Sequence, residues 1–393
     1  MLKRIRRAVA AILSFSLMFL CCGCWDMTDS MDRIIVVGIG VDTTTTEGLY
    51  DFTFQFLYPK ASAWELNATS FKFVNTTVKA RSLSLAQREL LKNFDASTTF
   101  EQLRTVVIGR DMSKENFEKV IEELFKENST RKKSLAVVSD EKAKDLILNN
   151  DIEMDSCIRI SEIITQYMVR GDGVLPSFNI QQLYIALENN LDFFLLNLSD
   201  YSTDNFSANG DVLSETDTSH DDEKALFITG LSYFKGGKLY GMLGNTELEI
   251  ARLISGKQSD GYMSFDNYNN VICYAITKSN CRRYITFKDG LPYFHMYITL
   301  DCDIIDSQLK YETDTEFKKM EALIIQNLTD NINSLINYSQ ENSCPELLAF
   351  QSEMRQAHAK WFDDHPDYWA NQYKDAAVEC SIECTVNTFS YTA

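Results

Sequence analysis

The stretch VICYAITKSNCRRYITFKDGLPYFHMYITLDC, residues 271–302, decides the fold class of this chain. Apolar and polar residues alternate along much of it, which is the pattern of half-buried strands. It predicts three strands, over residues 271–277, 281–287 and 292–302, separated by turns. The longest helical pattern follows at residues 315–338, with an apolar stripe at helical spacing: Phe317, Met320, Ile324, Leu328, Ile332 and Leu335. Hairpin-linked strands beside a long amphipathic helix predict an α+β fold, with largely antiparallel sheets packed against helices.

The N-terminal part of the chain alternates strand and helix patterns. Ser84 begins a capping-box pattern for a helix that runs to about Phe94, and Asp140 is expected to cap another helix. The alternation predicts a mixed α/β region over residues 24–199, divided into two subdomains. Strands are expected at residues 31–41, 50–58, 71–80, 103–109, 134–139 and 193–198.

Residues 200–224 interrupt this alternation. The segment is rich in Ser, Thr, Asn and Asp, which predicts an acidic linker or long loop. Beyond it, Gly236-Gly237 joins two strand patterns as a two-residue hairpin turn. We therefore expect about three domains, of which the last is a C-terminal α+β domain over residues 225–393.

The N-terminus has the pattern of an export and lipidation signal. Four basic residues within the first seven precede a 15-residue apolar run, Ala8–Cys22, which is shorter than the roughly 20 residues that a membrane span needs. Gly23 supplies a small residue before the cleavage site, and Cys24 follows it. We expect residues 1–23 to be a lipoprotein signal peptide and Cys24 to carry diacylglycerol and fatty acyl lipid. An uncleaved N-terminal anchor and a plain secretory signal are the alternatives.

The charge of the chain limits its partners. The 393 residues carry a formal net charge of −18, and removal of residues 1–23, with four basic and no acidic residues, lowers it to −22. Such acidity argues against nucleic acid as a partner and against docking of the folded surface on anionic lipid. A covalent lipid is then the natural way to hold the protein at a membrane, and stable anchoring takes more than one lipid chain.

Seven cysteines remain beyond Cys24. Cys380 and Cys384 fall in an alternating pattern that predicts a half-buried strand, and four residues along a strand span roughly 13 Å, too far for one disulfide or one metal ion. Buried free thiols are the favoured interpretation, although export would permit disulfides. Their redox state is left open.

Candidate catalytic and metal-binding motifs are weak. Gly38-Ile39-Gly40 follows a strand, but Thr43 replaces the third glycine of a dinucleotide-binding turn, and Asp42 is expected to bond local backbone. His358 and His365 lie seven residues apart, yet a zinc site needs three or four ligands of defined spacing. We expect no catalytic residue, no metal and no cofactor besides the lipid, and hence no enzymatic activity.

Three segments carry a family resemblance. Gly23-Cys24-Trp25-Asp26, followed by Val37-Gly38-Ile39-Gly40-Val41-Asp42, resembles the start of the Ger(x)C family, the C-subunit lipoproteins of spore germinant receptors. The hairpin from Ile228 to Leu243 is similar to a second family segment. The C-terminal order of a long helix, Trp361, the pair Tyr368-Trp369 and an alternating final strand is similar to a third.

The resemblance implies a non-enzymatic, mixed α/β lipoprotein that partners two integral membrane subunits in the spore inner membrane. It implies a role in assembly of the receptor or in relay of the nutrient signal that triggers germination. Binding of a small molecule by this subunit is doubtful, because ligand binding is attributed to a membrane subunit. The alternative is a solute-binding lipoprotein that delivers a nutrient to a transporter, although its two similar lobes are not evident here.

The lipidation hypothesis predicts the behaviour of a Cys24→Ala variant. Without the thiol, no thioether to lipid forms, so the protein should leave the membrane fraction or accumulate as uncleaved precursor. Fractionation and intact-mass analysis measure both outcomes. Correctly processed Cys24→Ala protein that stays on the membrane would contradict the assignment.

Overall fold

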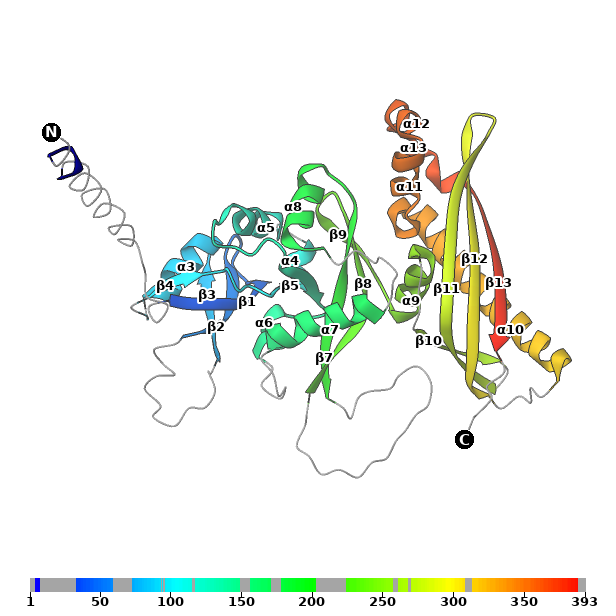
Figure 1. The fold of residues 1–393 in the computed structure, drawn as a ribbon, viewed down its shortest axis with the longest axis horizontal. Coiled ribbons are helices and arrows are strands. Elements are labelled where there is room, and N and C mark those ends of the chain that lie inside the picture. The colour runs from blue at the N-terminus through cyan, green and yellow to red at the C-terminus, as the bar shows by residue number, and fades with distance from the viewer. Residues whose placement is uncertain are drawn as a thin grey trace, which may run out of the picture.

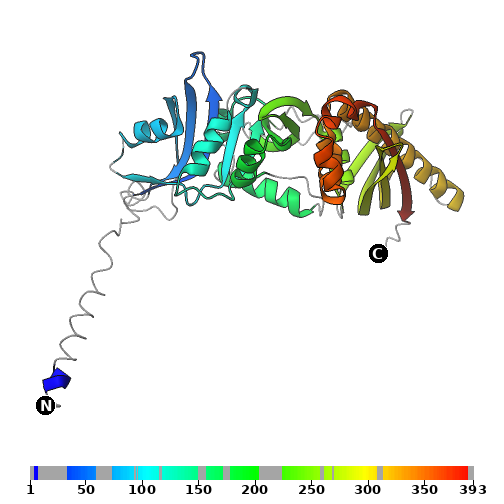
Figure 2. The ribbon, with the colours of Figure 1, turned by 90° about the horizontal axis from the view of Figure 1, so that it is seen from above.

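The protein contains two mixed β-sheets that lie side by side along an elongated molecule (Figure 1, Figure 2). The computed structural model describes residues 4–7, 33–58, 73–92, 94, 96–114, 117–148, 156–170, 178–202, 224–256, 261–267, 270–307 and 313–387. Helices pack against both sheets, so the predicted mixed α/β class is confirmed.

The first sheet has the strand order β3-β2-β1-β5-β6-β7-β8-β9, with β4 beside β1. β1, β5, β6 and β7 run parallel to one another, whereas β2 and β3 on one side and β8 and β9 on the other pair antiparallel. The strands are β1 (Arg33–Thr43), β2 (Tyr50–Leu57), β3 (Phe73–Ala80), β4 (Ser97–Thr99), β5 (Thr105–Gly109), β6 (Leu135–Ser139), β7 (Phe193–Ser202), β8 (Lys224–Lys235) and β9 (Lys238–Leu243).

Helices cover both faces of the first sheet and divide its apolar residues between two cores. One core receives side chains from α3 (Leu83–Leu91), α4 (Arg110–Lys114), α5 (Phe117–Lys126) and α8 (Ile180–Glu188). The other receives side chains from α6 (Ala143–Leu148) and α7 (Ser156–Arg170), and it continues into the second sheet.

The second sheet has the order β10-β11-β12-β13 and packs one face against α10 (Asp314–Glu341). Its first three strands are antiparallel, and β13 joins parallel to β12. The strands are β10 (Gly261–Asn267), β11 (Asn270–Lys288), β12 (Leu291–Ser307) and β13 (Ala377–Asn387); between α10 and β13 come η3 (Pro345–Leu348), α11 (Phe350–Ala357), α12 (Ala359–Asp364), α13 (Tyr368–Asn371) and η4 (Tyr373–Asp375).

A buried helix, α9 (Asn245–Ser255), connects the two sheets. It follows β9 of the first sheet, precedes β10 of the second, and lies between them in Figure 1. Leu248, Ile250, Leu253 and Ile254 are all at most 1% exposed. A helix that is apolar on several sides needs partners on several sides, and α9 finds them in both sheets and α10.

The predicted strands 271–277 and 281–287 are wrong as separate elements. They form one strand, β11, which is irregular between Ile276 and Lys278 but continues through the polar residues between them. Lys278, Ser279 and Asn280 stay extended because each pairs with a residue of β12, and Ser279 is buried. The chain reverses only at Asp289-Gly290, where both residues adopt positive φ.

Two predicted caps are also wrong. The side chain of Ser82, not Ser84, accepts the N-terminal bond of α3, from the Leu85 amide at 3.3 Å. Helix α6 is capped by Asp42 instead of Asp140. Local sequence patterns could not predict this contact, because Asp42 lies about a hundred residues before the helix that it caps.

The predicted linker, residues 200–224, lies mostly outside the described residues. Its ends belong to β7 and β8, which pair antiparallel from Phe193–Phe234 to Ser202–Lys224. The connection therefore joins two neighbouring strands of one sheet. Division of the chain into domains at this point stays a prediction, and any such boundary would pass through a hydrogen-bonded ladder.

The motif Gly38-Ile39-Gly40-Val41-Asp42 packs two helices onto the first sheet. A Cβ at residue 38 would lie 1.9 Å from Cys157 Sγ of α7, and one at residue 40 would lie 2.6 Å from the Ile147 side chain of α6. Asp42 accepts hydrogen bonds from the Ala143 amide at 2.8 Å and the Lys144 amide at 2.9 Å. The expected local backbone bond of Asp42 is thus replaced by a long-range helix cap.

Substitution Gly38→Ala should lower the free energy of unfolding by about 1–3 kcal/mol, because an added methyl overpacks the contact with α7. Gly244→Ala is the matched control, since its Cβ would meet only the flexible end of the Glu247 side chain, at 3.2 Å. Denaturant unfolding measures both. Equal stability of the two variants would contradict the close-approach role of Gly38.

Candidate functional site at the junction of the two sheets

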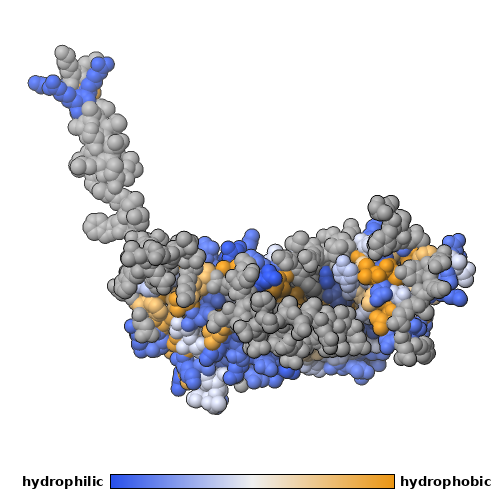
Figure 3. All heavy atoms as spheres, turned by 90° about the horizontal axis from the view of Figure 1, so that it is seen from below, coloured by the Kyte–Doolittle hydropathy of each residue, from blue (hydrophilic) through white to orange (hydrophobic). Residues whose placement is uncertain are grey.

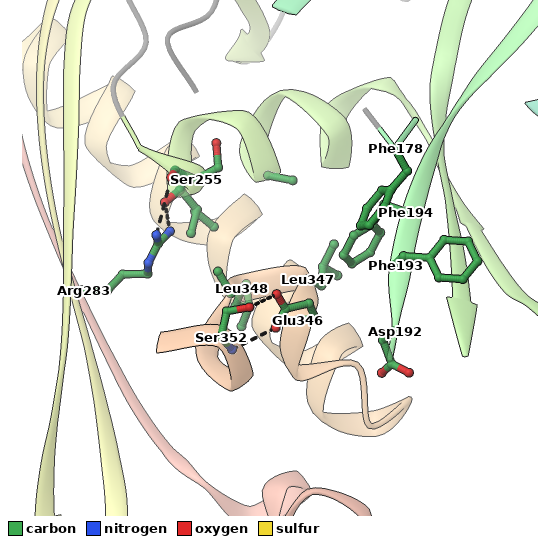
Figure 4. Close-up of a pocket in the computed structure, with 13 residues that line it drawn as sticks. Phe178, Asp192, Phe193, Phe194, Ser255, Arg283, Glu346, Leu347, Leu348 and Ser352 are labelled. Carbon is green, nitrogen blue, oxygen red and sulfur yellow. Dashed lines mark hydrogen bonds between the residues drawn. The ribbon is translucent and has the colours of Figure 1, made fainter. Parts of the chain in front are cut away.

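A cavity of about 300 Å³ lies where the first sheet meets the second (Figure 4). The first sheet contributes the start of β7, the second contributes β11, and η3, α9 and α11 complete the wall. We call this cavity the junction pocket. Its lining combines an apolar wall with two partly buried carboxyl groups and one guanidinium.

Aromatic side chains form the wall on the side of the first sheet. Phe193 stacks on Phe234 with ring centroids 4.8 Å apart, and Phe178 packs against Phe193 at 5.5 Å. Phe194 and, from η3, Leu347 extend the apolar lining. This wall is part of the core and is held rigidly, because Phe193 and Phe234 are fully buried.

Glu346 lies in η3 and points toward α11 (Figure 4). Its carboxylate accepts a hydrogen bond from the Ser352 amide at 3.0 Å and another from the Ser352 hydroxyl. Burial raises the pKa of Glu346, which the two hydrogen bonds to Ser352 partly offset. The nearby Asp192 raises this pKa further, whereas Arg283 lowers it.

Arg283 approaches the pocket from β11. Its guanidinium donates to the carbonyls of Ile254 at 2.5 Å and Ser255 at 3.5 Å, so it satisfies the C-terminal end of α9 (Figure 4). Its Nε lies 4.0 Å from the Glu353 carboxylate and has no hydrogen-bond partner among the described residues. Arg283 therefore holds α9 through its terminal nitrogens and faces Glu353 through Nε.

Asp192 completes the charged set from the first sheet. It accepts a hydrogen bond from the Tyr233 hydroxyl, and burial raises the pKa of both groups. Lys235, at the end of β8, donates to the Ser343 carbonyl at 3.2 Å and thereby connects the β8–β9 hairpin to the chain before η3. Two carboxyl groups, one from each side of the junction, thus lie within electrostatic reach of each other.

A strained backbone position borders the pocket. Ala349 has φ 56°, a left-handed conformation that is rare for a residue with a Cβ. It separates η3 from α11. The break allows Glu346 to turn back and bond Ser352 in the first turn of α11.

A second cavity of about 380 Å³ shares Asp192 with the junction pocket. Lys235, Pro345 and Trp369 also line it. The indole Nε1 of Trp369 is buried and has no hydrogen-bond partner among the described side chains and backbone. Trp369 otherwise packs within the C-terminal aromatic cluster, with Phe294, Phe362 and Tyr373.

The residues proposed from sequence lie elsewhere. Cys24 falls outside the described residues, so its lipidation stays a prediction. His358 packs edge-on against Phe287 at 5.1 Å, and His365 stacks on Trp361 at 4.4 Å, which gives each a packing contact. Among the described residues, no group of three or more His, Cys, Asp or Glu has a metal-binding arrangement.

Sequence reasoning missed the junction pocket entirely. Its charged members, Asp192, Arg283 and Glu346, are separated by 63 or more positions and share no motif. Only the tertiary contact of β7 with η3 and β11 brings them together.

The overall fold is similar to that of a solved protein. The crystal structure of the GerBC protein matches with a TM-score of 0.58 over 89% of this chain and 97% of that chain, at 14% identity, which shows a common fold. The fold class is therefore that of the GerBC structure.

The family follows from the sequence models. Residues 26–199 match the spore germination protein N-terminal domain, and residues 229–390 match the spore germination B3/GerAC-like C-terminal domain. The chain belongs to this spore germination family. Spore germination protein B3 of Bacillus subtilis (strain 168) is 20% identical over 91% of this chain and 90% of its own length. Spore germination protein A3 of the same organism is 22% identical over 70% and 68%.

The raised pKa of the partly buried Glu346 carboxyl predicts a pH dependence of stability. An acid whose pKa is raised on folding binds its proton more tightly in the folded state, so stability falls as pH rises from the ordinary value of 4.5 through the raised value. Glu346→Gln keeps an acceptor for Ser352 and removes the titration. The free energy of unfolding of Glu346→Gln, relative to that of the wild type, should therefore increase as pH rises over this range.

Chemical denaturation at a series of pH values from 4 to 8 measures the difference. Glu341→Gln, at an exposed position of α10, is the matched control and should follow the wild type. A wild-type curve parallel to that of Glu346→Gln would mean that Glu346 does not titrate in this range.

Proposed function

We propose that this chain is the membrane-anchored, non-catalytic subunit of a nutrient germinant receptor, which supports assembly of the receptor or relays the signal that triggers spore germination. The observation that carries the proposal is the match of two spore germination family models to residues 26–199 and 229–390. Together these models account for both sheets, so the relationship covers the whole described fold and not one module of it.

The anchor is the lipid on Cys24. The sequence supports it through the basic flank, the short apolar run and the Gly23-Cys24 site. Among the helices built from the described residues, none has the length and hydropathy to cross a bilayer. Among the coloured residues of the face in Figure 3, hydrophilic ones predominate and apolar ones gather in separate areas. A covalent lipid supplies the membrane affinity that such a surface and the charge of the processed chain, −18 − 4 = −22, do not favour.

The partners in this proposal are two integral membrane subunits, and the location is the outer face of the spore inner membrane. Residue 33, where β1 starts, is nine positions after Cys24, so at most about 30 Å of extended chain separates the lipid from the first sheet. The second sheet lies at the opposite end of the elongated molecule (Figure 2). Contact between the partners and both ends of this chain would couple them through the junction.

The junction pocket gives the alternative, a solute-binding lipoprotein, one specific observation in its favour. A cavity of about 300 Å³ with buried polar groups has the size of a small-molecule site. However, Glu346, Arg283 and Asp192 already bond to protein groups, and the two sheets differ in size and strand order, unlike a pair of similar lobes. Calorimetry of the purified chain with nutrient amino acids and sugars distinguishes the two, since tight binding favours the alternative.

Co-purification tests the receptor proposal. An affinity-tagged chain, extracted with detergent from spore membranes, should bring down two integral membrane proteins in fixed ratio, identified by mass spectrometry. A second experiment mixes Cys24→Ala protein with the same detergent extract and tests whether binding of the partners requires the lipid. If protein contacts hold the complex together, this variant should still bind the partners, although it should not reach the membrane in cells. Recovery of the tagged chain alone from spore membranes would overturn the receptor role.

A further inference from the structure

Two cysteines contact each other in the second sheet. Cys302 of β12 and Cys384 of β13 have their sulfur atoms 3.9 Å apart. The strands are parallel neighbours in which Leu300 pairs with Cys384 and Cys302 pairs with Val386. The two thiols are thus diagonal neighbours on the sheet face that packs against α10, and they are separated by 82 positions in the sequence.

The two thiols differ in access. Cys302 is completely buried, whereas Cys384 is partly exposed. Cys380 lies four residues earlier in β13, on the same face of the strand, and is also partly exposed. Because Cys380 pairs in register with Met296, it has no cysteine on the adjacent residue of β12 and offers a matched comparison.

We propose that Cys302 and Cys384 form a thiol pair that converts to an intramolecular disulfide, with a low-molecular-weight disulfide as the oxidant. The sulfurs must approach from 3.9 Å to about 2.05 Å. Diagonal neighbours in a sheet lie about 7–8 Å apart, slightly beyond the usual Cα separation of a disulfide, so closure combines rotation of the side chains with a small shift of the edge strand β13 along β12.

The reaction is a double thiol–disulfide exchange. The thiolate of Cys384, the accessible member, attacks one sulfur of the oxidant, forms a mixed disulfide and releases one small thiolate. The thiolate of Cys302 then attacks the Cys384 sulfur, forms the Cys302–Cys384 bond and releases the second small thiolate. The two cysteine protons pass to the released thiolates, so the protein is oxidised by two electrons and the small disulfide is reduced to two thiols.

Burial sets the rate of the second step. The contact with Cys384 and the loss of solvent raise the pKa of Cys302, so little of its thiolate is present near neutral pH. The exchange is therefore slow in the intact fold and accelerates at alkaline pH.

A Cys302–Cys384 disulfide would link the edge strand β13 covalently to the inner strand β12. The bond encloses α10 and all the short helices up to β13, and a covalent loop of this length restricts the unfolded chain. The edge strand β13 then remains attached to β12 even when α10 loosens. We therefore expect the oxidised protein to unfold at a higher temperature than the reduced protein. The inference is independent of the receptor role.

Peptide mapping tests the proposal on the full-length chain. The reduced protein is incubated with oxidised glutathione at pH 8.5, free thiols are alkylated in denaturant, and the digest is analysed by mass spectrometry. A linked pair of peptides containing Cys302 and Cys384, about 2 Da lighter than the two reduced peptides together, is expected. The thermal midpoint should rise on oxidation and return after reduction.

Two variants make the outcome specific. Cys384→Ser should abolish both the linked peptide and the rise in thermal midpoint, while Cys380→Ser should keep both. The inference is overturned if Cys302 and Cys384 are recovered alkylated after oxidation. It is equally overturned if Cys384 is recovered only as its glutathione adduct, because the buried thiol then fails to complete the exchange.

Discussion

Burial of α9 between the two sheets is the contact on which the rest of the structure depends. Each of its large aliphatic side chains contributes on the order of 1.5–3 kcal/mol when removed from water, and four of them are at most 1% exposed. The same helix provides carbonyls for Arg283 and part of the wall of the junction pocket. A single apolar core therefore runs from α6 and α7 through α9 to α10, and the second sheet is positioned by it.

The residues on which the family resemblance rests have packing and helix-capping roles in the structure. Gly38 and Gly40 allow α7 and α6 to touch the backbone of β1, and Asp42 satisfies the first amides of α6. The Gly-x-Gly-x-Asp pattern thus serves to pack two helices on β1. This role uses two glycines and does not need the third glycine of a nucleotide-binding turn. The C-terminal aromatic residues behave similarly, since Trp361 and Trp369 pack among neighbouring rings.

Local sequence patterns predicted most of the helices and strands. They did not predict contacts between segments that lie far apart in the sequence. The period of two identified β2, β12 and β13, and the stripe from Phe317 to Leu335 identified α10, because each pattern reports which side of one element is buried. The same reasoning divided β11 in two, since a polar run at Lys278–Asn280 resembles a turn until its partner strand is known. The cap by Asp42, the charged junction and the Cys302–Cys384 contact depend on pairings across roughly 60 to 100 positions, for which one sequence holds no local signal.

The order of strands also has a mechanical consequence. In the described part of the chain, the backbone passes from the first sheet to the second once, by way of α9. A pull or torque applied to the second sheet therefore reaches the first along one covalent path, and the noncovalent contacts around that path set its stiffness. The packing of α9 against both sheets therefore decides how firmly the second sheet is held at its position relative to the first.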